Sequence, residues 1–189
     1  GALAARELRV INCEPKHLES LIETLRSAGV SVETKKTEII VRAPLRLLPV
    51  DIKTHEYPGF PTDLQAPMTV LLTQADGEST VFETIFESRL NYTEALTSRG
   101  ARITMMNPQR ALVYGKSELR GRTLMSPDLR AGLAFVIAAI NAKGESVIHN
   151  VDTTIDRGYE DIENRLRAIG VNIERTEVDS GTASLLNNK

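Results

Sequence analysis

The sequence predicts an α/β fold in which apolar helices lie inside and sheets lie outside. The first observation behind this prediction is an internal repeat. The segments "LIETLRSAGVSVE" (21–33), "YTEALTSRGARIT" (92–104) and "IENRLRAIGVNIE" (162–174) each read as an apolar helix face, a glycine and an alternating strand. Their glycines recur about every 70 residues, which is long for a solenoid, so we expect a closed arrangement of a few α/β units.

The second observation is a repeated apolar helix. "DLQAPMTVLLTQADGES" from Asp63 and "DLRAGLAFVIAAINAKGES" from Asp128 share D-L-x-A, an apolar run and G-E-S. Each run leads into a strand-like segment, "STVFET" or "SVIHNV". Nearly every residue from 133 to 140 is apolar, and a helix that is hydrophobic all round must be buried. This places the helices inside the fold.

Each unit therefore reads in a fixed order: an acid-headed apolar helix, a strand, a loop, an amphipathic helix and a glycine stop. Two short strands, such as "VSVET" and "EIIVRA", close the unit. The glycines Gly29, Gly100 and Gly170 fit the left-handed position that ends a helix, which a residue without a Cβ adopts cheaply.

The beginning of the chain reads as an incomplete unit. Residues 1–7, "GALAARE", resemble the tail of a first D-L-x-A helix, and "LRVINC" reads as a short strand. We therefore expect about two and a half repeats in a single lobe and infer that the chain is a fragment of something longer. The expected divisions of the chain are approximately residues 1–50, 51–120 and 121–178, followed by a disordered tail at 179–189.

Composition excludes several classes of protein. With 23 Lys+Arg against 25 Asp+Glu, the net charge is -2, so the chain lacks the basic excess typical of nucleic-acid binding. Cys13 is the one cysteine, and His17, His55 and His149 are scattered, so we expect no disulfide and no metal site. The sequence also contains no glycine-rich nucleotide-binding loop, and we expect no cofactor.

The sequence also argues against a membrane protein. The longest strongly apolar stretch, residues 132–140, is too short to span a bilayer, and no secretion pattern opens the chain. A soluble, cytoplasmic protein is the expectation.

Two acids are candidates for chemistry or for helix capping. In "YPGFPTDLQ" (57–65), Thr62 is a suitable N-cap with Asp63 in the first helical turn, and Asp128 repeats the pattern after "SP". From these residues alone, capping is favoured for either acid. Capping leaves the stiff "YPGF" approach unexplained, however, because "MSPDLRA" begins an equivalent helix without it. A chemical role for Asp63 therefore stays open.

Three arginines suggest an anion site. Arg130 lies near a helix N-terminus, where a cation opposes the helix dipole, while Arg89 and Arg157 follow the repeated strands. Loops at matching places in a repeated fold converge on one end of the domain, where guanidinium groups could bind a phosphate or carboxylate. The alternative is that each arginine pairs with a neighbouring acid: Glu87, Asp128 or Asp156.

Four segments in order carry a resemblance to a known family: "YPGFPTDLQA" (57–66), "ETIFESR" (83–89), "DLRAG" (128–132) and "IDRGYEDIENRLRAIGVNIER" (155–175). From about residue 4 to 178, the chain resembles the C-terminal half of the UDP-N-acetylglucosamine 1-carboxyvinyltransferases, a family of enolpyruvyl transferases. The resemblance implies an inside-out α/β barrel lobe built from βαβαββ repeats. It also implies transfer of the enolpyruvyl group of phosphoenolpyruvate to the 3-hydroxyl of UDP-N-acetylglucosamine, with release of phosphate, as the first committed step of peptidoglycan synthesis.

The resemblance assigns catalytic and binding roles to residues of this chain. Asp63 would hold the sugar hydroxyl and is the candidate base, Asp128 would lie near the reacting carbon, and Ile85 would contact the nucleotide through its backbone. Arg157 would bind phosphoenolpyruvate and move with domain closure. The same cleft would be lined by Arg89 and Arg130.

The chain also departs from this family. The family's other lobe, with its phosphoenolpyruvate-binding lysine and its mobile loop, is missing, and Cys13 does not match the reactive residue of that loop. Ser88, Leu90 and Glu56 stand where asparagine, phenylalanine and proline are more common. We therefore expect the isolated lobe to be inactive and the N-terminal lobe to be its partner.

Two other functions remain as alternatives. A related enolpyruvyl transferase could use another acceptor such as shikimate 3-phosphate, although that family lacks "PGFPTD". A non-catalytic paralogue could keep the lobe only to bind the sugar nucleotide; the presence of Asp63, Arg130 and Arg157 argues against it.

Overall fold

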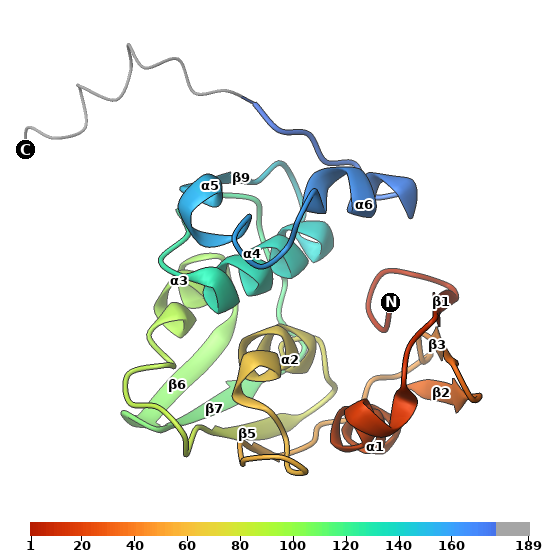
Figure 1. Cartoon of the computed structure of the whole chain (residues 1–189). Coiled ribbons are helices and arrows are strands. Elements are labelled where there is room, and N and C mark those ends of the chain that lie inside the picture. Colours follow the sequence, from red (N-terminus) through yellow and green to blue (C-terminus); the bar gives the residue numbers. More distant parts are fainter. Residues whose placement is uncertain (177–189) are drawn as a thin grey trace, which may run out of the picture.

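A computed structural model of the chain describes residues 1–176, and the expected tail at 179–189 lies outside the described residues. Helices and strands are interleaved along the chain, which confirms the predicted α/β class (Figure 1). The strands are β1 (Leu8–Ile11), β2 (Ser31–Thr34), β3 (Glu38–Arg42), β4 (Ile52–Lys53), β5 (Glu78–Phe82), β6 (Arg102–Asn107), β7 (Arg110–Tyr114), β8 (Thr123–Met125) and β9 (Val147–His149). The α-helices are α1 (Glu19–Ser27), α2 (Gln65–Leu72), α3 (Tyr92–Ser98), α4 (Leu129–Asn141), α5 (Val151–Thr154) and α6 (Ile162–Ala168), with short 3-10 helices η1 (Pro15–Leu18) and η2 (Thr62–Leu64).

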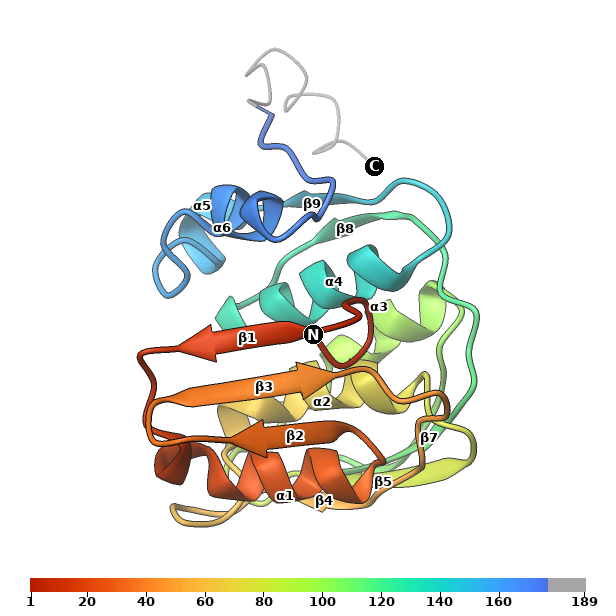
Figure 2. The ribbon, with the colours of Figure 1, turned by 90° about the vertical axis from the view of Figure 1, so that its right-hand side faces the viewer.

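The strands form three sheets, with orders β1-β3-β2, β4-β5-β7-β6 and β8-β9. β4 precedes α2 in the sequence and β5 follows it, and these two strands pair in parallel. In the same way, β8 precedes α4 and pairs in parallel with β9, which follows it. From β4 to β7 the order is therefore β-α-β-α-β-β, with the last two strands paired antiparallel. The sheet of β1, β3 and β2 lies in front of α2 and α4 when the molecule is turned (Figure 2).

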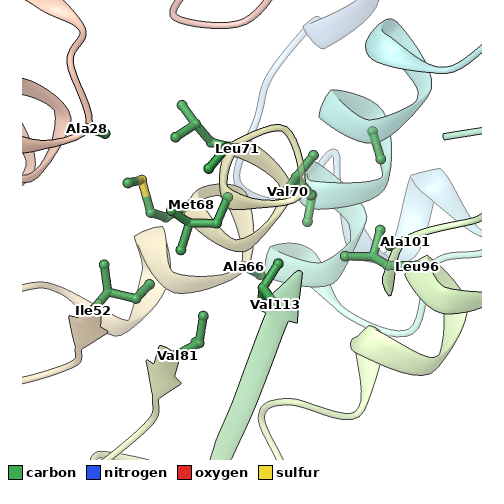
Figure 3. Packing of buried hydrophobic residues seen from close by; sticks show 14 of the residues in the cluster. Ala28, Ile52, Ala66, Met68, Val70, Leu71, Val81, Leu96, Ala101 and Val113 are labelled. Atoms are coloured by element: carbon green, nitrogen blue, oxygen red, sulfur yellow. The ribbon is translucent and has the colours of Figure 1, made fainter. Parts of the chain in front are cut away.

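Helix α2 occupies the interior of the fold. Seven of its eight residues are buried, and it packs directly against α4. Val81 of β5 and Val113 of β7 lie on the side of α2 that faces the sheet, and both belong to its apolar cluster (Figure 3). Burial on every side explains why the helix carries no charged residue.

Helix α4 is less completely buried than its sequence predicts. Its residues from 134 to 136 and Ala138 are buried, but Leu133, Ile137 and Ile140 are half-buried. Leu133 and Ile140 pack in a smaller cluster around Ile155. The prediction of a helix buried on all sides therefore holds for α2 and only in part for α4.

The predicted glycine stops are confirmed. Gly29, Gly100 and Gly170 have φ of 85°, 102° and 93° and follow α1, α3 and α6. The next residue's N–H reaches back to the carbonyl five residues earlier: Val30 to Leu25 at 3.0 Å, Ala101 to Leu96 at 3.1 Å and Val171 to Leu166 at 3.1 Å. This bond is the mark of the Schellman motif, whose left-handed residue favours glycine.

Two of these glycines give a matched test of backbone strain and steric contact. A Cβ at Gly100 would lie 2.4 Å from the carbonyl oxygen of Glu118, whereas a Cβ at Gly170 would meet nothing within 4 Å. We expect Gly170→Ala to lower the free energy of unfolding by about 1–2 kcal/mol through left-handed strain alone. Gly100→Ala should lower it further, because a backbone atom must also move. Urea unfolding of the two variants checks this, and equal losses would contradict it.

Two elements expected from the repeat are absent. Residues 1–7 form turns rather than the tail of a helix, and no strand occurs over 171–176. The corresponding strands β2 and β6 pair with β3 and β7, but the described residues contain no partner strand for 171–176. No helix between residues 1 and 176 is long and apolar enough to cross a bilayer.

Candidate functional site

The "YPGF" segment forms a tight loop that leads into the candidate site. The His55 N–H donates to the Phe60 carbonyl at 2.9 Å, and the Gly59 N–H donates to the Glu56 carbonyl at 2.8 Å. The hydroxyl of Ser20 in α1 donates to the Gly59 carbonyl at 3.0 Å. Phe60 is buried, and the next residues enter η2. The loop thereby fixes the start of the segment that carries Asp63.

Asp63 does not cap a helix. Neither η2 nor α2 has a side-chain cap, so the predicted N-cap role of Thr62 is wrong. Instead, the Arg130 Nε–H donates to Oδ1 of Asp63. Within residues 1–176 the other carboxylate oxygen, Oδ2, accepts no hydrogen bond, and the side chain is 63% exposed. Asp63 therefore presents one free carboxylate oxygen to solvent.

Arg89 and Arg130 converge on Asp63. The Arg89 Nη1–H donates to the hydroxyl oxygen of Thr62 at 2.9 Å, and Nη1 lies 3.7 Å from Asp63 Oδ1. The Arg89 guanidinium also stacks 3.9 Å from the centre of the Phe86 ring. In the described part of the chain, the remaining guanidinium N–H groups of both arginines have no protein acceptor. They can donate to a bound anion.

The electrostatics of Arg89 also suit an anion. Burial lowers the pKa of Arg89, and the nearby charge of Arg130 lowers it further, while Glu83, Asp63 and Asp128 oppose this change. Two guanidinium groups held close together repel each other, and a bound phosphate or carboxylate would relieve that repulsion.

Asp128 caps helix α4, as the sequence predicts. Its Oδ1 accepts from the backbone N–H of Arg130 at 2.8 Å and of Ala131 at 3.1 Å. Its backbone is extended, with φ -158° and ψ 173°, as an N-cap residue requires. The side chain of Arg130 leaves this acid and pairs with Asp63, which accounts for a cation at a helix N-terminus.

Substitution of Asp128 can separate the capping role from the charge. We expect Asp128→Ala to lower the free energy of unfolding by about 0.5–2 kcal/mol, because two backbone N–H groups lose their acceptor. Asp128→Asn should retain most of that stability, since asparagine also caps helices. Thermal and urea unfolding measure the difference, and equal destabilisation by both variants would contradict the capping role.

Glu83 is a residue of this site that the sequence interpretation missed. The side chain is fully buried and directly follows β5. The hydroxyls of Thr54 and Thr62 donate to its two carboxylate oxygens at 3.0 and 2.8 Å. These threonines precede it by 29 and 21 residues, so no local pattern marks Glu83. The backbone N–H of Ile85 also donates to Glu83, at 2.8 Å, which leaves the Ile85 carbonyl for any backbone contact with a ligand.

Arg157 is exposed and makes no side-chain hydrogen bond or ion pair among residues 1–176. Its neighbour Gly158 packs on Leu129, where a Cβ would lie 2.8 Å from the leucine side chain. The loop therefore lies against the start of α4. Asp156 is held by Arg175 at 2.8 Å and is not the partner of Arg157.

The alternative in which the arginines pair with neighbouring acids is therefore wrong for Arg89 and Arg130. Both lie against Asp63, which is distant in sequence. Tyr159 adds a further group here: burial raises the pKa of its phenol, the negative charge of Asp63 raises it more, and Arg130 opposes the change.

A cleft of about 720 Å³ adjoins the arginines. It runs from the loop after β5 along α3 to the start of α4 and is lined by Glu87, Ser88, Arg89, Asn91, Tyr92, Glu94, Ala95, Ser98, Met125, Pro127, Asp128, Arg130 and Phe135. The described residues contain no group of three or more His, Cys, Asp or Glu side chains that could hold a metal ion.

Comparison with known proteins identifies the family. A family profile described as EPSP synthase (3-phosphoshikimate 1-carboxyvinyltransferase) matches residues 1–166. The chain belongs to the enolpyruvyl transferase family. Curated enolpyruvyl transferases named UDP-N-acetylglucosamine 1-carboxyvinyltransferase are similar to it: 45% identity over 171 residues in Desulfofundulus thermocisternus and 43% over 175 residues in Koribacter versatilis. The matched regions cover 90% and 93% of this chain.

Solved enolpyruvyl transferases share the fold. The enolpyruvyl transferase NikO from Streptomyces tendae superposes over 94% of this chain and 42% of its own, with a TM-score of 0.83 and 24% identity. An EPSP synthase from Acinetobacter baumannii superposes over 93% of this chain and 41% of its own, with a TM-score of 0.67 and 18% identity. The chain spans 40% of the Koribacter relative and 70% of the Desulfofundulus relative.

Proposed function

We propose that this chain is one lobe of an enzyme that transfers the enolpyruvyl group of phosphoenolpyruvate to the 3-hydroxyl of UDP-N-acetylglucosamine, releasing phosphate. The observation that carries the proposal is the group of Asp63, Arg89 and Arg130, which combines a free carboxylate oxygen with unused guanidinium donors. The names of the relatives that are 43–45% identical support this acceptor. In the cell, the reaction would serve peptidoglycan synthesis in the cytoplasm.

The proposed chemistry uses each group for a different need. Oδ2 of Asp63 accepts a hydrogen bond from the sugar hydroxyl and orients it or takes its proton, while Arg89 and Arg130 bind the anionic groups of phosphoenolpyruvate. The hydroxyl oxygen attacks the carbon that bears the phosphate, the terminal vinyl carbon gains a proton, and a tetrahedral intermediate forms. The intermediate then expels phosphate and loses a proton from its methyl carbon, which regenerates the double bond.

The other proposed site residues complete the cleft. Asp128 lies near the reacting carbon, the Ile85 carbonyl contacts the nucleotide, and Arg157 swings onto the anion when the site closes. The exposed position of Arg157 and its lack of a partner in the described residues support a mobile role of this kind.

We further propose that the lobe is part of an inside-out α/β barrel and acts with a second lobe. Burial of α2 between a sheet and α4 supports the arrangement of helices inside and sheets outside. The greater length of the curated relatives supports the second lobe. The divisions 1–50, 51–120 and 121–178 remain the proposed units.

Phosphate release tests the proposed function. We expect the full-length protein to release phosphate from phosphoenolpyruvate when UDP-N-acetylglucosamine is present and not when shikimate 3-phosphate replaces it. We expect the 189-residue chain alone to release none. Phosphate release with shikimate 3-phosphate only would show that the acceptor is shikimate 3-phosphate and not UDP-N-acetylglucosamine. Calorimetric binding of the sugar nucleotide without any release would indicate the non-catalytic paralogue.

A further inference from the structure

Glu83 is a buried carboxylate that accepts four hydrogen bonds from neutral donors and forms no ion pair among the described residues. Its relative exposure is 0%, and the described residues place no lysine, arginine or histidine within ion-pair distance of it. Oε1 accepts from the Thr54 hydroxyl at 3.0 Å and from the backbone N–H groups of Ile85 at 2.8 Å and Phe86 at 3.2 Å. Oε2 accepts from the Thr62 hydroxyl at 2.8 Å. Such complete satisfaction is what a buried charge requires.

The bond to Oε2 decides what Thr62 can offer to its other neighbour. A hydroxyl has one proton and two acceptor lone pairs, and Thr62 gives its proton to Glu83. Only lone pairs remain, and the Arg89 Nη1–H donates to one of them at 2.9 Å. The charge on Glu83 therefore makes Thr62 an acceptor for Arg89.

A second connection runs from Glu83 to the same arginine. The N–H of Phe86 bonds to Glu83, and the Phe86 ring carries the Arg89 guanidinium at 3.9 Å. Glu83 thus holds both surfaces that Arg89 touches, the Thr62 hydroxyl on one side and the aromatic ring on the other. Because Arg89 uses only Nη1 for these protein hydrogen bonds, its remaining donors stay available beside Asp63.

We propose that Glu83 is a positioning residue that fixes Arg89 for an anionic substrate by holding the Thr62 proton away from the guanidinium. The identity of that anion as phosphoenolpyruvate rests on the proposed function, while the link between Glu83 and Arg89 does not. The carboxylate itself stays buried and touches no substrate.

Glu83→Gln tests the link with almost no change of shape. The Oε1 side faces three donors, and two of them are backbone N–H groups that cannot reverse, so the amide oxygen takes that side. The amide NH2 group then donates to Thr62, whose own proton must turn away from residue 83. The hydroxyl is then no longer fixed as an acceptor for Arg89, and the bond between Arg89 and Thr62 weakens. Glu78→Gln, an exposed change at the start of the strand that Glu83 follows, is the matched control.

The readout is the guanidinium NMR signal of Arg89 in the ligand-free 189-residue chain, followed by titration with inorganic phosphate and phosphoenolpyruvate. We expect hindered guanidinium rotation in the parent chain and in Glu78→Gln, and free rotation in Glu83→Gln. We also expect about tenfold weaker anion binding in Glu83→Gln. Thr62→Val removes the same acceptor by another route, and the double variant should lose no more than either single variant.

A purely structural Glu83 would give a different pattern. Glu83→Gln would then lower stability but leave the Arg89 signal of the folded chain unchanged, and that result overturns the proposal. If Glu83→Gln does not fold, an unchanged Arg89 signal in Thr62→Val overturns it equally. A full-length protein without turnover would refute the proposed function, yet the Arg89 signal would still decide the role of Glu83.

Discussion

Asp63→Asn should reduce turnover of the full-length protein by about 10²- to 10⁴-fold, the usual contribution of a positioned acid or base. Asparagine keeps the size of the side chain but cannot take a proton, and it binds Arg130 without charge. Asp63 caps no helix, and its side chain is 63% exposed in the ion pair with Arg130. We therefore expect the free energy of unfolding to change by less than about 1 kcal/mol. Steady-state phosphate release and urea unfolding of the same variant measure the two effects.

A second exposed ion pair provides the control. Asp76 pairs with Arg46 at 2.7 Å, and its side chain is 58% exposed, which closely matches Asp63. Asp76→Asn removes the same charge at a residue that pairs with neither Arg89 nor Arg130, and it should leave turnover unchanged. If Asp63→Asn retained parental turnover, Asp63 would be a structural partner of Arg130 and the proposed chemistry would need another acid.

The parts of the fold that depend on local bonds were predictable. Each helix stop at Gly29, Gly100 and Gly170 needs only a left-handed residue and a bond to a carbonyl five residues earlier, so the sequence contains all the information. Capping by Asp128 is equally local, because its carboxylate accepts from the backbone N–H groups two and three residues later. The repeat then extended these local predictions along the chain.

Elements that depend on distant partners were not predictable in this way. Residues 171–176 carry the alternating pattern of a strand but have no partner strand among the described residues. Thr62 is a good N-cap by type, yet Glu83 and Arg89 occupy its hydroxyl. In both cases a tertiary arrangement overrides a local preference, as β-propensity and capping preferences allow.

The candidate site shows the same division. The sequence identified Asp63, Arg89 and Arg130 by chemistry and by resemblance, but their pairing joins Asp63 to an arginine 67 residues later. Acids close in sequence were the expected partners of Arg89 and Arg130. In the structure, neither arginine side chain forms an ion pair with such an acid. Glu83 was missed because its role depends on the groups that donate hydrogen bonds to its carboxylate. Those donors come from three separate parts of the chain.

Leu72→Ala tests whether the helix that begins beside the site is the centre of the fold. Leu72 at the end of α2 is fully buried in the main apolar cluster. Truncation removes three carbon atoms and leaves a cavity, and we expect the free energy of unfolding to fall by about 2–5 kcal/mol. Since natural domains are stable by only about 5–15 kcal/mol, this loss should be visible as a clear shift of the urea midpoint.

Leu45→Ala makes the same chemical change at a fully exposed leucine and should stay within about 0.5 kcal/mol of the parent chain. Equal effects of the two changes would show that α2 is not a core helix.

Leu72→Ala and Asp63→Asn should lose activity for different reasons. Because η2 and Asp63 lie directly before α2, activity of Leu72→Ala should follow the folded fraction and return when the temperature is lowered. Activity of Asp63→Asn should stay low in fully folded protein, which only a chemical role for the carboxylate explains.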